Sequence, residues 1–517
     1  MLRALLAGLA CCLLMACATA PRPAAQAAPP LGVSPAEMTR ADALVNEGCY
    51  RCLREALTLY ERAVLTDQQF STTLLLALRE KELGMDALPW LERARAMATA
   101  ATVHYIDIAT AIPWTAPVSA SDFDTPFPRP SQVAFEQWLR QLRPPSPSAL
   151  DRYMLLALQC GRQQTPAGVV ADTPLLQYRL GICNFGQRQQ LDTVFATSPR
   201  FAEAGYFIAR NEMVNSGAAP AQVTRALPLL TTAHEAIPES PAITVSLARV
   251  WAGRNEFLRA LALHDEALAL RPAQRDALLG RATMLTYLGR ADQAIVSATR
   301  LIDLGTWYLG DAYYWRAWNL YNTGQVDAAA LDVERARQFQ SGDQLLTLSG
   351  MIAYDQQRRA KARKDFENSR RMNPVNCPAL WYLGTINVDE RTWSDGRDMF
   401  AEAARCYGLA VDVIANEQTA PDLSPEMRQW QEQDRARRLA DNRRQQARSA
   451  LNVALLSQQL GDRDQAREFA EIAAGHELTR DRAQGVLTSV SGFSTPPRDG
   501  RPAAPSPATS AVPASPR

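Results

Sequence analysis

Small residues recur at a step of 34 positions through the middle of this chain of 517 residues. They fill one equivalent place in six successive units, at Ala226, Ala260, Ala294, Ala328, Ala362 and Gly396. Proline recurs at the same step at Pro238 and Pro272, and again three steps later at Pro374. A small side chain at a fixed place lets two helices approach closely, and a proline ends the second helix because a further turn cannot form there. The period therefore predicts an all-α fold built from repeated helix pairs.

The apolar positions inside each unit follow one pattern. In one unit Leu380, Leu383 and Gly384 precede Gly396, Phe400 and Ala403, and in the unit before it Leu346, Gly350 and Ala353 precede Ala362, Phe366 and Pro374. This spacing resembles the tetratricopeptide repeat (TPR), whose pattern is W-x2-L-G-x2-Y, then A-x3-F, then P. The units differ from it because Thr or Leu replaces the tryptophan, and Asn387 stands where tyrosine is usual. The resemblance implies a solenoid of helical hairpins wound into a right-handed superhelix with a concave face.

A positive start, an apolar run and a small residue before a cysteine mark the N-terminus as a targeting segment. Arg3 carries the charge, residues 4–15 are apolar but too few for a permanent membrane span, and Ala16 precedes Cys17. This arrangement resembles the bacterial lipobox. The resemblance implies cleavage after Ala16, acyl chains such as palmitate on Cys17 and, with Ala18 in place of aspartate, sorting to the outer membrane facing the periplasm. An ordinary secretory signal with an accidental cysteine is the alternative.

The composition and the repeat divide the chain into eight segments. They are a lipoprotein signal peptide (1–16), an Ala/Pro-rich tether (17–35), TPR-like helices (36–100), a Pro-rich insertion (101–147), the TPR array (148–408, clearest over 221–408), a helical insertion that interrupts the array (409–446), a last TPR-like unit (447–478) and a Pro-rich tail (479–517). We expect the tether and the tail to be disordered because proline, alanine and serine dominate them. A long polar helix is expected over 429–444, after a Ser-Pro-Glu start at 424–426.

Six cysteines remain after the signal segment, and an even number in an exported chain favours disulfides. Neighbours in sequence pair as Cys49–Cys52, Cys160–Cys183 and Cys377–Cys406, among the fifteen connectivities that six cysteines allow. The last pair has most support, because Cys377 begins one expected helix and Cys406 ends the antiparallel next one. Cys49 and Cys52 also form a CxxC at a helix start, where a lowered thiol pKa would permit redox chemistry. We favour a local structural staple there, because no βαβ pattern surrounds the motif.

The charge balance and the histidine count argue against several classes of function. Lysine and arginine number 55 against 54 aspartates and glutamates, so the chain lacks the basic excess that nucleic-acid binding needs. Its 4 histidines are far apart and lack metal-ligand spacing. The chain also contains no GxSxG, HExxH or Walker A motif. We therefore expect no catalytic residue, no metal site and no cofactor.

In TPR proteins the concave face, lined by the first helices, binds peptides or partner domains, and the resemblance implies the same here. Helical spacing places on or near this face Arg249, Tyr287, Tyr314, Trp318, Tyr321, Asn322, Met351, Tyr354 and Trp381. Aromatic residues are enriched at interface centres, although some of these could instead fill crevices between first helices. The Lys/Asn cluster with which chaperone-adaptor TPRs hold an acidic C-terminal tail is missing, since the only lysines are Lys81, Lys361 and Lys364. We expect the partner to be a protein segment rich in apolar or aromatic residues.

These features predict an exported, membrane-anchored TPR scaffold for protein–protein interaction, related to assembly or secretion in the cell envelope. A second hypothesis is an envelope enzyme, or an activator of a cell-wall enzyme, with redox chemistry at the CxxC or chemistry between Pro113 and Pro147. A third is a soluble exported binder without an anchor. A basic run over 358–371 is interpreted as a solvated helix surface, with binding to anionic lipid or glycan as the alternative.

Overall fold

The computed structural model of the chain describes residues 33–111, 148–158, 170–183, 188–216, 220–305, 308–418 and 425–491. These ranges hold 23 helices and no strand, which confirms the predicted all-α class. Among the helices of these ranges, none combines the length and the apolar character that a membrane span requires. The expected signal peptide, the lipidation site Cys17, most of the Pro-rich insertion and the part of the tail after Ser491 lie outside the described residues. The expectation of a disordered tail over 479–517 needs a correction at its start, because residues 479–491 belong to the helix Glu477–Ser491.

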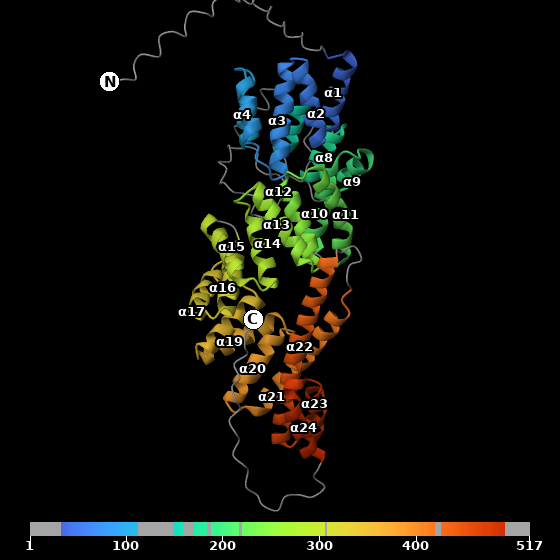
Figure 1. The fold of residues 1–517 in the computed structure, drawn as a ribbon. Helices are drawn as coiled ribbons and strands as arrows, with labels where there is room; N and C mark the ends of the chain where they lie inside the picture. The colour runs from blue at the N-terminus through green and yellow to red at the C-terminus, as the bar shows by residue number, and fades with distance from the viewer. Residues whose placement is uncertain are drawn as a thin grey trace, which may run out of the picture.

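A block of ten helices precedes the regular array (Figure 1). These helices are α1 (Pro35–Glu47), α2 (Tyr50–Arg62), α3 (Thr66–Glu82), α4 (Leu88–Met97), α5 (Val103–Ala111), α7 (Ala149–Leu158), α8 (Pro174–Cys183), α9 (Arg188–Thr197), α10 (Ala202–Ser216) and α11 (Pro220–Ala236). The first five do not simply stack ahead of the others, because α1 packs against α8 and α3 packs against α7. The hydroxyl of Ser240 also donates to the carbonyl of Leu83 at 2.5 Å. One apolar core therefore joins residues from Ala41 to Val250.

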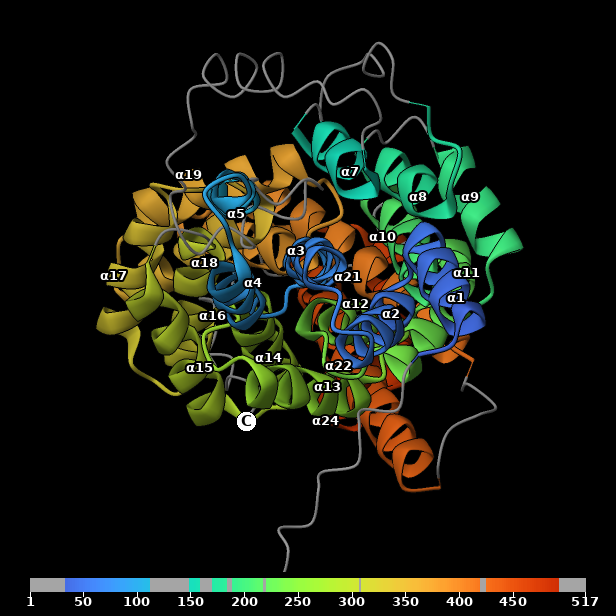
Figure 2. The same cartoon turned by 90° about the horizontal axis from the view of Figure 1, so that it is seen from above.

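The array continues as successive helix pairs. Its helices are α12 (Pro241–Gly253), α13 (Phe257–Leu270), α14 (Arg275–Tyr287), α15 (Ala291–Leu304), α16 (Leu309–Asn322), α17 (Val326–Ala336), α18 (Asp343–Asp355), α19 (Arg359–Met372), α20 (Cys377–Asp389), α21 (Trp393–Ala415), α22 (Pro425–Leu460), α23 (Arg463–Ala474) and α24 (Glu477–Ser491). Each first helix packs against the second helix of its own unit. Seen from above, α13 to α19 follow a curve (Figure 2). The predicted TPR-type solenoid of helical hairpins is therefore confirmed.

The small repeated residues lie where the two helices of a unit meet. Ala260, Ala294 and Ala362 are fully buried, and a Cβ at Gly350 would lie 2.7 Å from the ring of Phe366. Glycine is thus the residue that lets this aromatic ring fill the space between α18 and α19. One repeat position needs a correction. The buried small residue of α17 is Ala329, whereas Ala328 is exposed, because this unit runs one residue late.

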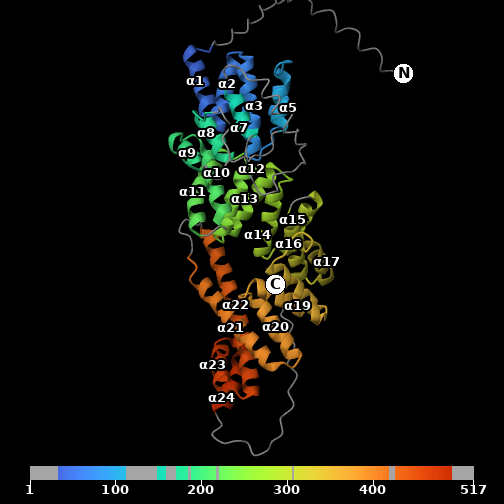
Figure 3. The same cartoon turned by 180° about the vertical axis from the view of Figure 1, so that it is seen from behind.

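Two helices are longer than the repeat requires. The second helix α21 extends past Cys406 to Ala415, and α22 contains the expected polar helix within 36 residues. The two extensions pack against each other, and we call them the hairpin arm (407–418 and 425–446). The remainder of α22 is the first helix of the last unit and pairs with α23. Figures 1 and 3 show α22 running from α23 and α24 back towards α13 and α14.

Candidate interaction surface

The first helices of the array form one continuous side. Each of α12, α14, α16 and α18 contacts the first helix of the next unit as well as its own second helix. Helices that approach their counterparts this closely lie on the inside of a curved solenoid, where the path is shorter. We call this side the inner face, and it carries Tyr287, Trp318 and Tyr354. It is the face that the sequence predicts as the binding surface.

Three of the nine predicted binding residues lie in the core. Tyr314, Tyr321 and Trp381 are no more than 9% exposed. The helical spacing places them on the inner side correctly, but it does not show that neighbouring first helices cover them. A first helix such as α16 packs against the second helix of its own unit, that of the preceding unit and the first helices on either side, so only a narrow strip of it reaches solvent. These three aromatic residues therefore fill crevices between first helices, which is the alternative that the sequence left open.

The other six predicted residues reach the surface to different extents. Tyr287 is 44% exposed, and its ring stacks on Phe257 at a centroid distance of 4.9 Å. Arg249 is also exposed, and the partly exposed residues are Trp318, Asn322, Met351 and Tyr354. Trp318 and Met351 pack against the core cluster around Tyr314 while keeping part of their side chains accessible. These side chains offer apolar contact area at fixed positions, which favours recognition of an apolar or aromatic segment.

Charged groups at the edge of the inner face are paired. Arg249 forms an ion pair with Asp276, which also accepts a hydrogen bond of 2.8 Å from Tyr308. The guanidinium of Arg359 lies 3.8 Å from the ring centroid of Tyr354. Burial, and secondarily the carboxylate of Asp389, raises the pKa of the Tyr354 hydroxyl, so the group remains a neutral hydrogen-bond donor. The face is thus an apolar strip between paired charges, without an excess of either sign among these residues.

The hairpin arm and the turn of α22 that follows it contact both ends of the inner face. Near its base, Arg448 on α22 lies 5.6 Å from the ring centroid of Trp381. Near its tip, Trp430 meets Phe257 edge to face with the centroids 6.0 Å apart, and Arg437 Nη2 donates to the carbonyl of Tyr287 at 3.1 Å. Sequence analysis missed this docking. The available signal was a single tryptophan, Trp430, in an otherwise polar helix.

A buried cluster of charged residues holds the N-terminal block together, and sequence analysis also missed it. Glu82 accepts hydrogen bonds from Arg79 at 2.9 Å, from Arg179 and from the hydroxyl of Tyr153. Arg79 is completely buried, pairs also with Glu203, and lies 3.7 Å from the ring centroid of Tyr178. The charges compensate one another across α3, α7, α8 and α10, so this cluster is a structural clamp rather than a reactive site. The sequence signal was the run Arg-Glu-Lys-Glu directly after five apolar residues (74–78).

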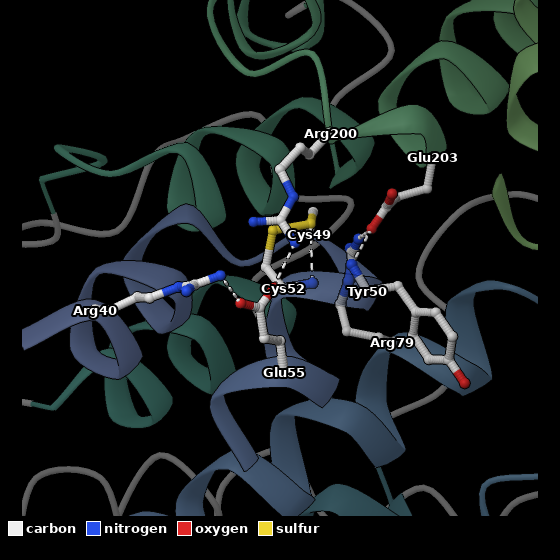
Figure 4. Close-up of a disulfide and its surroundings, with 8 residues drawn as sticks. All are labelled: Arg40, Cys49, Tyr50, Cys52, Glu55, Arg79, Arg200 and Glu203. Atoms are coloured by element: carbon white, nitrogen blue, oxygen red, sulfur yellow. Dashed lines mark hydrogen bonds and ion pairs between the residues drawn. A yellow bond between two sulfur atoms is a disulfide. The ribbon is translucent and has the colours of Figure 1, made fainter. Parts of the chain in front are cut away.

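The CxxC motif is a buried disulfide at the start of α2. Cys49 and Cys52 are bonded to each other and fully buried, and Cys49 Sγ accepts a hydrogen bond from the amide of Cys52. Figure 4 shows Arg200 and Arg40 beside the motif, both paired with Glu55. The hydrogen bond from Arg200 is the main cause that lowers the pKa of Glu55. Glu47 lies within 4.8 Å of both sulfurs, but in the disulfide form these sulfurs offer no thiolate to a metal or a substrate.

The second disulfide joins the two helices of one array unit. Cys377 at the start of α20 is bonded to Cys406 in α21, with the Cα atoms 5.5 Å apart. The proposed partner of Cys183, Cys160, lies outside the described residues, as do the residues of the Pro-rich insertion from 112 onward.

The basic run on α19 is largely neutralised by neighbouring carboxylates. Lys361 pairs with Asp365 and Glu334, Arg363 pairs with Glu390, and Arg370 with Glu402. These pairs are partly exposed, so each contributes little to stability. They leave this helix with less positive potential than its composition indicates, which favours the interpretation as a solvated surface.

No protein-family model matches the chain, and no curated protein sequence matches it. Among solved structures the chain is similar to Pseudomonas aeruginosa PilF, with 15% identity, a TM-score of 0.37, and coverage of 49% of this chain and 98% of that one. It is also similar to PilW, described as a widely conserved type IV pilus biogenesis factor, with 16% identity, a TM-score of 0.36, and coverage of 48% and 98%. A third structure, YrrB, a TPR protein with an unusual peptide-binding site, has 20% identity, a TM-score of 0.29, and coverage of 34% and 91%. At these values the likenesses carry no inference about a partner or a pathway.

Proposed function

We propose that this protein is a scaffold of the cell envelope whose inner face binds an apolar or aromatic segment of another protein. The observation that carries the proposal is the strip formed by Tyr287, Trp318, Met351 and Tyr354, which come from three successive first helices and stay partly accessible. Accessible apolar side chains that lie together on one face of a protein are characteristic of interaction sites. Large aromatic groups held on rigid helices are well suited to anchor a partner segment.

The membrane location is a separate part of the proposal. Its support is the lipobox-like sequence around Ala16 and Cys17, with Ala18 favouring the outer membrane. The disulfides Cys49–Cys52 and Cys377–Cys406 agree with an oxidising compartment such as the periplasm. A lipid on Cys17 would hold the array at the membrane surface, where a bound partner could be used in assembly or secretion.

The binding part is tested by crosslinking in living cells. A photoreactive amino acid placed at Trp318 is expected to trap one predominant partner, which is then identified by mass spectrometry. For the double variant Trp318→Ala/Tyr354→Ala, the photoreactive amino acid is placed at Asn322 instead. This variant is expected to trap no partner, while its helical circular dichroism stays unchanged. Leu331→Ala is the matched control, because Leu331 is 67% exposed but belongs to the second helix α17. Equal capture by the double variant and the control would place binding elsewhere.

The anchor is tested by metabolic labelling with radioactive palmitate. The wild-type chain is expected to take up label and to fractionate with outer membranes, and Cys17→Ala is expected to do neither. Absence of label from both chains would remove the anchor and leave a soluble exported binder. This result would not bear on the inner face, which the crosslinking addresses independently.

A further inference from the structure

The hairpin arm runs back along the array, so that its base and its tip lie beside units that are far apart in the sequence. It leaves the array beside α20 and α21, where a Cβ at Gly408 would lie 2.7 Å from the side-chain amide of Gln446. Its tip reaches α13 and α14 through Trp430 and Arg437. The units of α16 and α18 lie between these two places along the array. The arm therefore connects the two ends of the stretch of first helices that carries Trp318, Met351 and Tyr354.

The arm is tied together internally. Arg438 donates to both carboxylate oxygens of Glu417, at 2.8 and 2.6 Å, and also pairs with Asp434. Arg435 donates to the carbonyl of Glu417 at 2.8 Å. These contacts join the beginning of α22 to the residues that follow α21. They let the arm keep its own hairpin structure whether or not its tip is docked.

The base and the tip of the arm are held very differently. Beyond the base, α22 enters the core of the last unit through Ala450, Leu451 and Val453, all of which are buried. At the tip, the half-buried Trp430 rests at the margin of the cluster of Phe257, Leu261 and Leu285. Arg437 is exposed and divides its hydrogen bonds between Tyr287 and its own neighbour Asp434. Among the residues that the structure describes, the tip is held by this aromatic ring and by exposed polar contacts, which is typical of the weakly protected parts of a fold.

We propose that the hairpin arm is a reversible latch over the inner face. Docked through Trp430, it restricts access to the strip of Tyr287, Trp318 and Tyr354; released, it opens that strip to a partner segment. The function of the latch rests on the proposed function of the inner face. Its docking is a property of this chain alone and can be measured without a partner.

The test uses the full chain and the variant Trp430→Ala. Limited trypsin digestion followed by mass spectrometry reports cleavage inside the arm, after Arg428, Arg435, Arg437 and Arg438. A cysteine introduced as Asn322→Cys in both backgrounds reports access to the inner face through its rate of reaction with a maleimide carrying a polyethylene glycol chain. We expect Trp430→Ala to raise arm cleavage and labelling each about tenfold, because the docked state loses its main apolar contact. Cleavage elsewhere is expected to remain at the parent rate.

Two matched variants separate docking from general damage. Trp430→Phe keeps an aromatic ring and is expected to behave like the parent, and so is Gln433→Ala on an exposed position of the same helix. Unchanged arm cleavage or unchanged labelling in Trp430→Ala would overturn the latch. So would an equal rise of cleavage along the whole chain, because the arm would then be a fixed brace. None of these outcomes involves a partner, so failure here is distinguishable from failure of the crosslinking test of the inner face.

Discussion

The hydroxyl of Tyr321, near the end of α16, donates to the carboxylate of Asp355, the last residue of α18, at 2.7 Å and 34 residues along the chain. One repeat further, the hydroxyl of Tyr354 approaches Asp389 at 3.5 Å, the outer limit of a hydrogen bond. Units of a solenoid contact only their neighbours, so the cooperativity of unfolding of the array depends on such links between units. Tyr321 is buried, and this burial raises the pKa of its hydroxyl, which therefore stays a donor at all physiological pH values.

Removing the hydroxyl with Tyr321→Phe is expected to lower the free energy of unfolding by about 1 kcal/mol, the usual net value of one hydrogen bond. Urea unfolding followed by circular dichroism measures the change. Tyr354→Phe is the matched control, and its expected loss is below about 0.5 kcal/mol because the bond to Asp389 is long. Equal losses from the two variants would contradict a specific role for the Tyr321–Asp355 link.

The repeat itself could be predicted because it depends on local spacing, and Ala260, Phe366 and Gly384 all follow it. The docking of Trp430 on Phe257 could not, because the two residues are far apart in the chain and no period links them. Whether Tyr321 and Trp381 are exposed or fill crevices stayed open for a related reason. Spacing gives the direction of a side chain, but the distance between neighbouring first helices decides its exposure. The charges at Arg79 and Glu82 were missed because a charge run is ordinarily solvated, and only the meeting of four helices shows their compensation.

Gly280 on α14 allows His264 on α13 to fill the space between these two helices, where successive units meet. A Cβ at Gly280 would lie 2.1 Å from the imidazole ring of His264, which is buried. We expect Gly280→Ala to destabilise the protein by about 1–3 kcal/mol, because the ring has no room to move in a packed interior. The melting temperature measured by differential scanning calorimetry reports this change.

Gly485 on α24 provides the opposite control, because nothing lies within 4 Å of the place where its Cβ would be. Gly485→Ala is expected to stabilise the helix by about 0.5–1 kcal/mol, since alanine loses less backbone entropy on folding. If both alanine variants shifted the melting temperature in the same direction, steric contact with His264 would not be the cause at Gly280.

His264 also predicts a dependence of stability on pH. Burial, followed by the charge of Arg249 and opposed by Asp276, lowers the pKa of His264 from 6.5 to about 3. At a pH between these two pKa values, His264 binds a proton in the unfolded chain but not in the folded chain. Stability must therefore fall as the pH decreases below about 6.5, with a contribution approaching about 1.4 kcal/mol per pH unit. Urea unfolding at pH 7.0, 6.0 and 5.0 measures the slope.

His264→Phe isolates this contribution, because phenylalanine occupies the equivalent position in later units, at Phe366 and Phe400. The variant is expected to lose less stability than the parent between pH 7.0 and 5.0, whatever its stability at pH 7.0. The same slope in both proteins would mean that His264 becomes protonated in the folded state.

Glu82 is the acidic centre between Arg79 and Arg179 in the N-terminal block. Glu82→Gln removes the negative charge but keeps nearly the same volume, so two buried guanidinium groups lose their shared carboxylate. We expect a loss of about 3–5 kcal/mol, the range for breaking a buried ion pair at one partner. Amide hydrogen exchange should show the loss first in α3 and α8, which carry the cluster.

Glu61→Gln is the matched control, because Glu61 pairs with Arg93 at the surface of the same block, where both side chains are more than a third exposed. Solvent screens such a pair, and the expected change is within about 0–1 kcal/mol. A loss at Glu82 as small as that at Glu61 would mean that water or a neighbouring group replaces the carboxylate. The cluster would then not be the clamp that holds α3 against α8 and α10.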